Sequence, residues 1–196
     1  MGSLKLITIR DAGAADEEAV RQLMLGAYEQ YAAVLPPARW EAYRESIASS
    51  AHGDGPIARI VAEIEGEIVG SVQLFDSSLA AYGRPELDIR SPIIRLLSVS
   101  PQSRGLGIAT ELIKESVRRC LALKASALHL HTSDMMQSAV RLYERLGFER
   151  AADKDIRNGD ALIKGYRLLL NESILLQWQE RLVGQEAAHP RTGGEQ

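Results

Sequence analysis

The stretch SVSPQSRGLGIAT, residues 98–110, decides our interpretation of this sequence because it joins a predicted strand to a predicted helix. The strand is the apolar run PIIRLLSVS, residues 92–100, and the helical pattern covers residues 105–124. A helix leaves backbone N–H groups unpaired at its start, and these groups, together with the helix dipole, bind anions. Gly105 and Gly107 would let an anion approach the backbone, and Arg104 adds a forked cationic donor. We therefore expect a phosphate or pyrophosphate at the amides of residues 102–109.

The glycines alone fit equally well a turn that only reverses the chain. Two nucleotide-binding fingerprints can be compared with the loop. A Walker loop ends in Gly-Lys-Ser/Thr, whereas this loop ends in Gly107-Ile108-Ala109. A Rossmann loop needs a third glycine where Thr110 stands, and an acidic residue about 20 positions on, where the chain reads Ser126-Ala127-Leu128. Both fit poorly, so the sequence disfavours a nucleotide-dependent enzyme of either type.

Alternating and helical hydrophobic patterns divide the rest of the chain into strands and helices. The predicted order is a strand (4–10), two helices (16–35 and 37–49), a hairpin turning at Glu65-Gly66-Glu67, a loop (76–92), the strand 92–100, the helix 105–124, a strand (128–132), a helix (138–146) ended by Gly147, and two closing strands (148–152 and 162–169). We expect the very apolar strand 92–100 at the centre. This order predicts a mixed α+β fold, with one central sheet and helices on its faces.

The composition limits the partners and the compartment. The 196 residues suffice for one compact domain, and the net charge of −3 offers no basic field for nucleic acid. No apolar run is long enough to cross a bilayer, so we expect no membrane partner. Cys120 is the only cysteine, which excludes an intramolecular disulfide, and without a secretory leader we expect the cytoplasm.

The segment 171–196 is expected to be separate from a domain that spans residues 1–170. Ile174, Trp178 and Leu182 share one helical face, with Leu175 and Val183 near it, and the chain turns polar after Gly184. This pattern predicts a C-terminal helix followed by a disordered tail. The apolar face is expected to pack across a homodimer, and docking on its own chain is the alternative.

Two blocks of the sequence resemble the GNAT acetyltransferase superfamily. Residues 102–107, QSRGLG, resemble its Q/R-x-x-G-x-G/A signature, and residues 139–149, AVRLYERLGFE, resemble its A-x-x-L-Y-x-x-x-G-F segment. The blocks cover about residues 93–149, and the element order extends the resemblance to about 4–170. It implies a mostly antiparallel sheet and a direct transfer of acetyl from acetyl-CoA to a primary amine of a small molecule or peptide. A non-catalytic acyl-CoA-binding regulatory module on the same fold is the alternative.

The resemblance also implies which residues would bind acetyl-CoA. The end of the central strand would bind the pantetheine arm, and the following loop would surround the pyrophosphate. Ser138 or Ser133 could replace an Asn that the family often carries where Met136 stands. The implied cofactor-binding residues are Leu97, Ser98, Val99, Gln102, Arg104, Gly105, Leu106, Gly107, Ile108, Ala109, Thr110 and Ser138.

Tyr143 matches the tyrosine of the family's second block and is the implied catalytic residue. A phenol with a pKa of about 10 can protonate the leaving thiolate and stay neutral at pH 7. Its alternative is a core position, because Ala139, Leu142, Tyr143 and Leu146 form one helical stripe. A backbone N–H near residues 97–98 would stabilise the oxyanion.

The family often carries a catalytic Glu where Ile93 stands, so that base is absent. Nearby carboxylates read as ordinary solvated charges, and we assign no base, because an amine can lose its proton to bulk water; these carboxylates are Glu86, Asp88 and Asp134.

Several other residues have two interpretations. His129 and His131 alternate on one strand and favour a structural role over a metal site, because no third ligand is evident. Cys120 reads as core. Aromatic residues of the first two helices could line an acceptor pocket, where Glu29 would suit a cationic amine, or simply pack; they are Tyr28, Tyr31, Trp40 and Tyr43.

Overall fold

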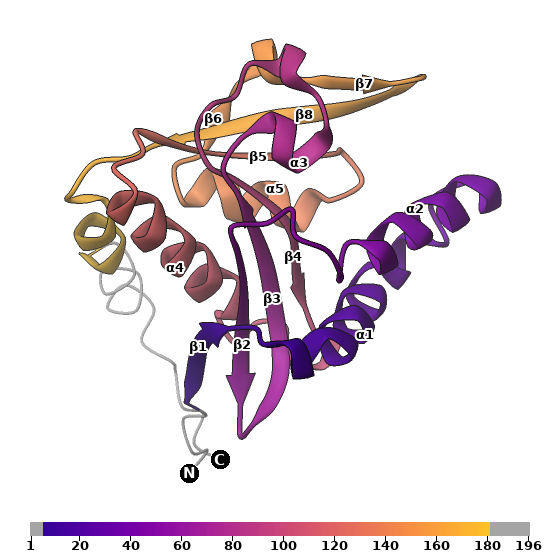
Figure 1. Cartoon of the computed structure of the whole chain (residues 1–196), viewed down its shortest axis with the longest axis horizontal. Helices are drawn as coiled ribbons and strands as arrows, with labels where there is room; N and C mark the ends of the chain where they lie inside the picture. The colour runs from indigo at the N-terminus through magenta and orange to yellow at the C-terminus, as the bar shows by residue number, and fades with distance from the viewer. Residues whose placement is uncertain (1–5, 181–196) are drawn as a thin grey trace, which may run out of the picture.

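The computed structural model describes residues 6–180, which form an α+β fold built on one mixed sheet (Figure 1). In this part of the chain, eight strands form the sheet in the order β1-β2-β3-β4-β5-β8-β6, with β7 also paired to β8. Only the β4–β5 pair is parallel, so the sheet is mostly antiparallel, as the resemblance implied. The strands are β1 (Ile7–Asp11), β2 (Ala58–Ile64), β3 (Glu67–Phe75), β4 (Ile93–Val99), β5 (Ala127–Thr132), β6 (Glu149–Arg150), β7 (Ile156–Asn158) and β8 (Ala161–Leu169).

Helices cover both faces of the sheet. Side chains of successive strand residues point to opposite sides, so both faces carry apolar side chains that the helices bury. Ile60 and Ala62 of β2 belong to one core with helices α4 and α5, whereas Val61 belongs to a second core with α1 and α2. The predicted fold class is therefore confirmed. The helices are α1 (Glu17–Tyr28), α2 (Pro37–Ser49), α3 (Ser78–Tyr82), α4 (Ile108–Ala122) and α5 (Gln137–Arg145), with short 3-10 turns η1 (Ala14–Asp16), η2 (Glu29–Tyr31), η3 (Pro85–Leu87), η4 (Pro101–Ser103) and η5 (Ala152–Lys154).

Strand β4 lies at the centre of the sheet, and its second half departs from its neighbours. Two residues of β4, Leu96 and Leu97, stand opposite the single residue Val72 of β3, which is a β-bulge. Leu96 has a φ of +52°, a left-handed conformation that is strained for a branched apolar residue. On the other side, β4 pairs with β5 only at Ile93 and Ile94, so the two strands separate beyond that point. The last five residues of β4 therefore have a free edge.

Several predicted boundaries were wrong. The predicted helix 16–35 ends as an α-helix at Tyr28 and continues as turn η2. The predicted loop 76–92 contains helix α3, which starts at the cap Ser77 and ends at the left-handed Gly83. The predicted strand 148–152 is only the two residues of β6, and strand β7 was missed. The first strand starts at Ile7 rather than at residue 4, and residues 1–5 lie outside the described part.

The C-terminal segment is helical over residues 174–180, and it docks on its own chain. Ile174 and Trp178 are buried in the core below α4 and α5, and the Trp178 Nε1–H donates to the Leu146 carbonyl at 3.0 Å. These contacts agree with the alternative interpretation, in which the apolar face of this helix docks on its own chain. Leu182, Val183 and the expected disorder after Gly184 lie outside the described residues. A dimer through this helix stays a prediction, which contacts within one chain do not test.

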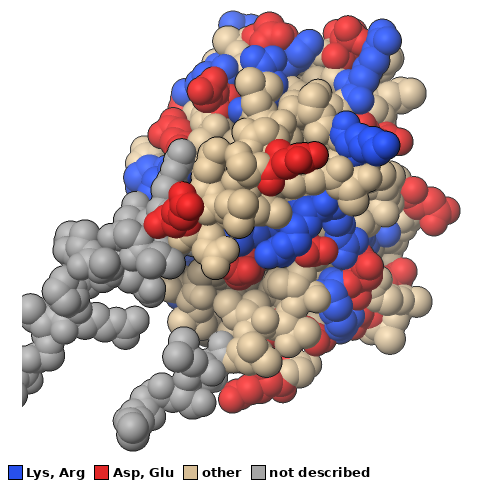
Figure 2. All heavy atoms as spheres, turned by 90° about the vertical axis from the view of Figure 1, so that its left-hand side faces the viewer, with Lys and Arg blue, Asp and Glu red and all other residues tan. Residues whose placement is uncertain are grey.

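Charged residues of both signs lie side by side on the face formed by β1 and α4 (Figure 2). Arg10 pairs with Asp16 and Glu63, and Arg119 pairs with Asp11 and Glu115. These ion pairs tie β1 to β2 and to α4. Of the helices within residues 6–180, none has the length and apolar character needed to cross a membrane.

Candidate functional site

A pocket of about 440 Å³ opens where β4 and β5 separate. Its walls come from the free end of β4, the loop before α4, the first turn of α4, helix α5 and the end of α1. The lining residues are Ala27, Tyr28, Gln30, Tyr31, Leu97, Val99, Ser103, Arg104, Gly105, Gly107, Ile108, Ala109, Thr110, Met136, Ser138, Ala139, Leu142, Tyr143 and Arg145.

The loop before α4 presents backbone N–H groups to this pocket. Gly105 and Gly107 have φ values of +79° and +81°, which only glycine adopts without strain. The helix begins at Ile108, and its ladder starts with the Glu111 N–H donating to the Gly107 carbonyl at 3.1 Å. The N–H groups of Ile108, Ala109 and Thr110 therefore have no acceptor within the helix. Together with the helix dipole, they make an anion site at this end of the pocket.

The free edge of β4 forms the second polar wall. The Ser100 N–H donates to the Val69 carbonyl of β3 at 2.9 Å, and Gly70 stands opposite Val99. Because backbone groups of an antiparallel strand alternate in direction, Val99 directs its N–H and C=O away from β3. Leu97 and Val99 both line the pocket. This edge can accept an extended, amide-containing ligand as a further strand would bind.

Arg104 connects the loop to helix α1, far away in the sequence. Its guanidinium donates to the Ala27 carbonyl at 3.2 Å and to the Gln30 side-chain oxygen at 3.4 Å. The sequence suggested this side chain only as a donor to an anion. In the structure it also fixes the end of α1 against the loop, so one residue joins two walls of the pocket.

Tyr143 of α5, in the second sequence block, reaches the pocket from the core that contains α4 and α5. The residue is only 7% exposed, and its ring packs against Phe148 with 5.7 Å between centroids. Its hydroxyl has no hydrogen-bond partner among residues 6–180, so it is free to bind a ligand. Burial raises the pKa of Tyr143, and the neighbouring Tyr31, Tyr82 and Tyr43 raise it further. The phenol therefore stays protonated at neutral pH and is available as a proton donor.

Ten of the thirteen predicted site residues line the pocket, and three do not. Ser98 is buried at 1% exposure, and its hydroxyl donates to the Leu96 carbonyl at 2.9 Å across the bulge. Gln102 is exposed on turn η4, where its side chain accepts from the Ser100 hydroxyl. Leu106 is exposed and points away between the two glycines. Along a strand, the backbone groups of successive residues point alternately to one neighbour and to the other. This alternation could have shown that the backbone of Ser98, between Leu97 and Val99, points toward β3.

The pocket also contains residues that the sequence did not suggest. Arg145 is exposed at the mouth of the pocket, seven residues after Ser138. A spacing of seven puts both residues on one helical face, and this signal could have found it. Ala27 and Gln30 carried no such signal, because tertiary packing alone brings them to the pocket.

The carboxylates considered as bases do not line this pocket. Asp88 pairs with Arg90, and Asp134 pairs with Lys164. Glu86 lies 3.9 Å from the Arg84 guanidinium. Ile93, at the family's usual Glu position, is fully buried beside Phe75. The pocket thus presents tyrosines and backbone groups, with no carboxylate among its lining residues.

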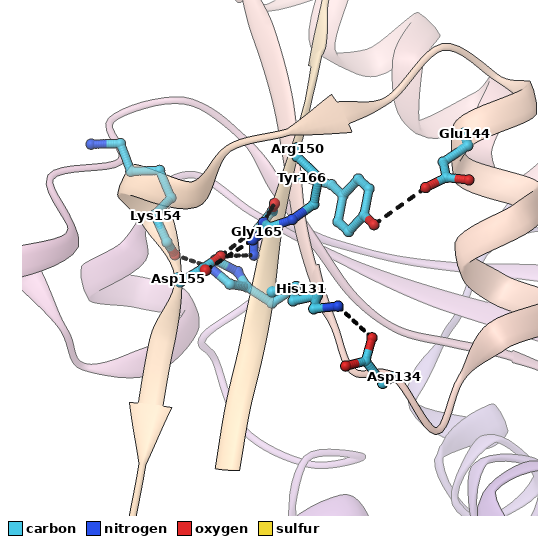
Figure 3. Close-up of polar contacts among 9 residues, drawn as sticks. His131, Asp134, Glu144, Arg150, Lys154, Asp155, Gly165 and Tyr166 are labelled. Carbon is cyan, nitrogen blue, oxygen red and sulfur yellow. Dashed lines mark hydrogen bonds and ion pairs between the residues drawn. The ribbon is translucent and has the colours of Figure 1, made fainter. Parts of the chain in front are cut away.

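The two strand histidines make separate, internal contacts. His129 is buried, and its Nδ1 lies 3.0 Å from the Ser91 hydroxyl. Burial, and to a smaller extent the positive charge of Arg167, lowers the pKa of His129 to about 4. The His131 Nε2 lies 2.7 Å from the Lys154 carbonyl, so it must carry the proton, and Nδ1 accepts from the Tyr82 hydroxyl at 2.9 Å. Figure 3 shows His131 beside the Arg150–Asp155 ion pair. Within residues 6–180, no three His, Cys, Asp or Glu side chains could hold a metal.

Cys120 lies fully buried on the inner face of α4. Burial raises the pKa of its thiol to about 12. The thiol is therefore neutral and unreactive at physiological pH, as expected for a core residue.

The aromatic residues of the first two helices divide between the two proposed roles. Tyr28 and Tyr31 line the pocket, whereas Trp40 is buried in the second core. Tyr43 contacts the rings of both Tyr28 and Trp40, at 5.9 and 6.4 Å. Glu29 is exposed and does not line the pocket.

Comparisons with known proteins agree with this architecture. The chain is 37% identical over 90 residues to the probable N-acetyltransferase family 8 member 5 of Mus musculus. That match covers 46% of this chain and only 37% of the relative. PaiA N-acetyltransferase from Thermoplasma acidophilum, solved in complex with coenzyme A, superposes with a TM-score of 0.65 at 15% identity over 83% of this chain and 99% of its own. Ard1 from Thermoplasma volcanium gives a TM-score of 0.59 at 19% identity, covering 85% and 99%.

The two structural likenesses show a shared fold. A family-level match extends over the part of the chain that builds the pocket. The model of the acetyltransferase (GNAT) family matches residues 18–148, which run from helix α1 to the end of the second sequence block. This is more than half of the chain, and the chain therefore belongs to the acetyltransferase (GNAT) family.

Proposed function

We propose that this protein is an acetyl-CoA-dependent N-acetyltransferase that moves the acetyl group directly to a primary amine of a small molecule or peptide. One observation carries the proposal: the unpaired N–H groups at the start of α4, the free edge of β4 and the Tyr143 hydroxyl line the same pocket. These groups match, in turn, a diphosphate, an amide-containing arm and a leaving thiolate. Family membership supports the same reaction class.

The residues of the pocket fit acetyl-CoA. The amides of residues 104–110 would hold the pyrophosphate, since Gly105 and Gly107 leave open space above the loop. Arg145 at the mouth adds a positive charge for phosphate. Leu97 and Val99 would bind the amides of the pantetheine arm, and Ser138 offers a hydroxyl from α5. When bound, acetyl-CoA supplies the activated acetyl group as a thioester.

The chain's own groups then account for the transfer. The bulge at Leu96 and Leu97 turns backbone out of the ladder, and an N–H there would donate to the acetyl oxygen as negative charge develops. The amine nitrogen forms the new C–N bond, and the C–S bond breaks. The Tyr143 hydroxyl gives its proton to the sulfur and recovers one from solvent. The acceptor nitrogen gives up its protons to water, one before it attacks and one as it becomes the amide, since no carboxylate is among the described residues that line the pocket.

Replacing Tyr143 with Phe tests the proposal, because the change removes one unpaired hydroxyl and leaves the ring packing intact. We expect kcat to fall about 10²- to 10⁴-fold, the range of general acid catalysis, with little change in KM for acetyl-CoA. Thermal stability should stay the same, since no hydrogen bond within the chain is lost. The measurement is thiol release from acetyl-CoA with a panel of amines. Tyr166→Phe is the matched control, because this hydroxyl contacts Glu144 outside the pocket (Figure 3).

The same assay decides between the enzyme and the non-catalytic acyl-CoA-binding module. A module would bind CoA in a calorimetric titration and release no thiol with any amine. Unchanged turnover in Tyr143→Phe across the pH range would refute the assigned acid and leave the reaction class standing.

We further propose that residues 1–170 form the catalytic domain, with residues 171–196 as a docked helix and tail. We propose the cytoplasm as the compartment, because the single Cys120 is a buried free thiol that forms no disulfide.

A further inference from the structure

Arg95 of β4 lies on the sheet face opposite to α4, two residues before Leu97. Its guanidinium stacks over the rings of Tyr82 and Phe75, at 4.8 and 5.6 Å, and donates to the Ala81 carbonyl. The remaining N–H groups of this side chain have no acceptor within residues 6–180, and no carboxylate pairs with it. Arg95 is half-buried, so within the described part of the chain this is a fixed, partly desolvated cation without a counter-ion.

Polar groups without a hydrogen-bond partner in the described chain lie on the same side of the sheet as this cation. Gln73 of β3 stands directly opposite Arg95 in the register and is only 2% exposed. Its Nε2 donates to the Ser50 carbonyl, but its Oε1 has no partner in the described chain. The hydroxyls of Tyr28 and Tyr43, on α1 and α2, also have no hydrogen-bond partner among residues 6–180. A fold satisfies most of its buried polar groups, so the unpaired Gln73 oxygen opposite Arg95 points to a ligand.

The electrostatics of this cluster favour an anion. Burial raises the pKa values of Tyr28, Tyr43 and Tyr82, and the positive charge of Arg95 opposes this effect in all three. No carboxylate of the described residues is among the groups that shift these hydroxyls. The positive potential of Arg95 therefore reaches both helices and α3.

The cluster lies within reach of the reacting centre. Arg95 lies only two residues before Leu97, and the bulge between them makes the strand advance less than the about 6.6 Å of two regular strand residues. Tyr28 belongs to this cluster and also lines the pocket, and its ring lies among the groups near Tyr143. A small acceptor could place its amine at the thioester and a second group at Arg95.

We propose that Arg95 binds a carboxylate of the acceptor, so that the acceptor is a primary amine carrying a carboxylate, of the amino acid class. The inference rests on the proposed acetyltransferase function and adds to it the substrate class. A fork of guanidinium donors matches the two oxygens of a carboxylate, and the Tyr82 ring holds the fork in plane. The Gln73 amide oxygen and the two tyrosine hydroxyls remain available for other polar groups of the acceptor. The described residues that line the pocket include no carboxylate, which argues against polycationic acceptors.

The test compares acceptors that differ only in this charge. L-amino acids, β-alanine and 4-aminobutyrate are assayed with acetyl-CoA. Each is compared with the molecule in which an uncharged carboxamide replaces the carboxylate. We expect kcat/KM to be about 10- to 100-fold higher for the best carboxylate than for its amide. Arg95→Gln should lower the carboxylate's kcat/KM to the level of the amide and leave the amide's value unchanged. Arg95→Lys should restore part of the preference, because it keeps the charge without the fork.

Arg90→Gln is the matched control, because Arg90 is exposed and already paired with Asp88. This variant should change the kcat/KM of neither the carboxylate nor the amide. Circular dichroism verifies that each variant folds. Equal rates for acids and amides, or an equal loss for both in Arg95→Gln, would overturn the inference and leave the acetyltransferase intact. If no acceptor is turned over, the acceptors are titrated into the CoA-saturated protein by calorimetry. Binding of an amino acid in preference to its amide supports the inference, and no such preference refutes it, whereas absent heat with CoA alone refutes the proposed function.

Discussion

Replacing Gly70 with Ala should push helix α4 away from the sheet. A Cβ at Gly70 of β3 would lie 2.5 Å from Ile108 Cγ2 and 3.0 Å from Leu112 Cδ1. Carbon atoms prefer about 3.5–4.0 Å, so the helix must retreat by about 1 Å at this point. Both side chains are buried in the core, so any shift must displace their neighbours. We expect a loss of about 1–3 kcal/mol in the free energy of unfolding, the usual cost of overpacking a core.

The same displacement should weaken CoA binding, because Ile108 is the first residue of α4. Its N–H, with those of the next two residues, belongs to the proposed phosphate site, and hydrogen bonds of this kind depend steeply on distance. We expect the CoA dissociation constant to rise about tenfold or more. Thermal unfolding should show a Tm lower by about 2–12 °C for a chain of this size, and calorimetry measures the affinity.

Gly26→Ala is the matched control for this prediction. Gly26 lies inside α1, where an added Cβ meets no heavy atom within 4 Å. Because alanine favours a helix over glycine, this variant should gain about 0.5–1 kcal/mol. If Gly70→Ala kept the wild-type Tm and CoA affinity, the close packing of α4 on β3 would not set the position of the anion site, and the reasoning would be refuted.

Two further predictions concern stability away from the pocket. Because the pKa of His129 is about 4 in the folded chain and about 6.5 unfolded, the unfolded state binds more protons below pH 6.5. Stability should therefore fall as the pH drops from 7.5 to 5.0, by about 1–2 kcal/mol through this residue. Urea denaturation at both pH values should show a smaller fall in His129→Gln, and an identical fall would contradict the assignment. Trp178→Ala should cost about 3–5 kcal/mol, because the ring is buried and hydrogen-bonded, whereas exposed Leu176→Ala should cost under about 0.5 kcal/mol; equal Tm values for these two variants would show that the docking does not hold in solution.

The strand-to-helix junction could be predicted because its signals are local. Apolar residues before it, two glycines within it and helical periodicity after it predicted both the elements and the anion site. The exact helix start could not be predicted, since either glycine could begin the helix. In the structure both adopt positive φ, and the helix begins only at Ile108. Helix α3 had cap signals at Ser77 and Gly83, but its five residues are too few to show periodicity.

The bulge in β4 and the contact of Arg104 with α1 could not be predicted. Leu96 carries no sequence signal for a left-handed conformation, so only surrounding packing imposes it. Arg104 reaches Ala27, 77 positions away along the chain, and no local pattern encodes such a contact. Most predicted residues nevertheless line the pocket, because residues of one strand end and one helix start remain neighbours in any such fold. The acceptor side depends on contacts between distant elements, and the sequence left it open.

The location of the unsatisfied polar groups argues for ligands on both sides of β4. Each buried polar group without a partner costs about 1–3 kcal/mol, so a fold rarely keeps several of them in one place. Here one such group, the Gln73 oxygen, lies with the half-buried Arg95 on one side of the strand, and the amides at the start of α4, which line the pocket, lie on the other. The strained bulge at Leu96 stands between them, at the point where β5 leaves the sheet. Two substrates that meet at the bulge would relieve both sets of groups at once, which is the arrangement that direct transfer between them requires.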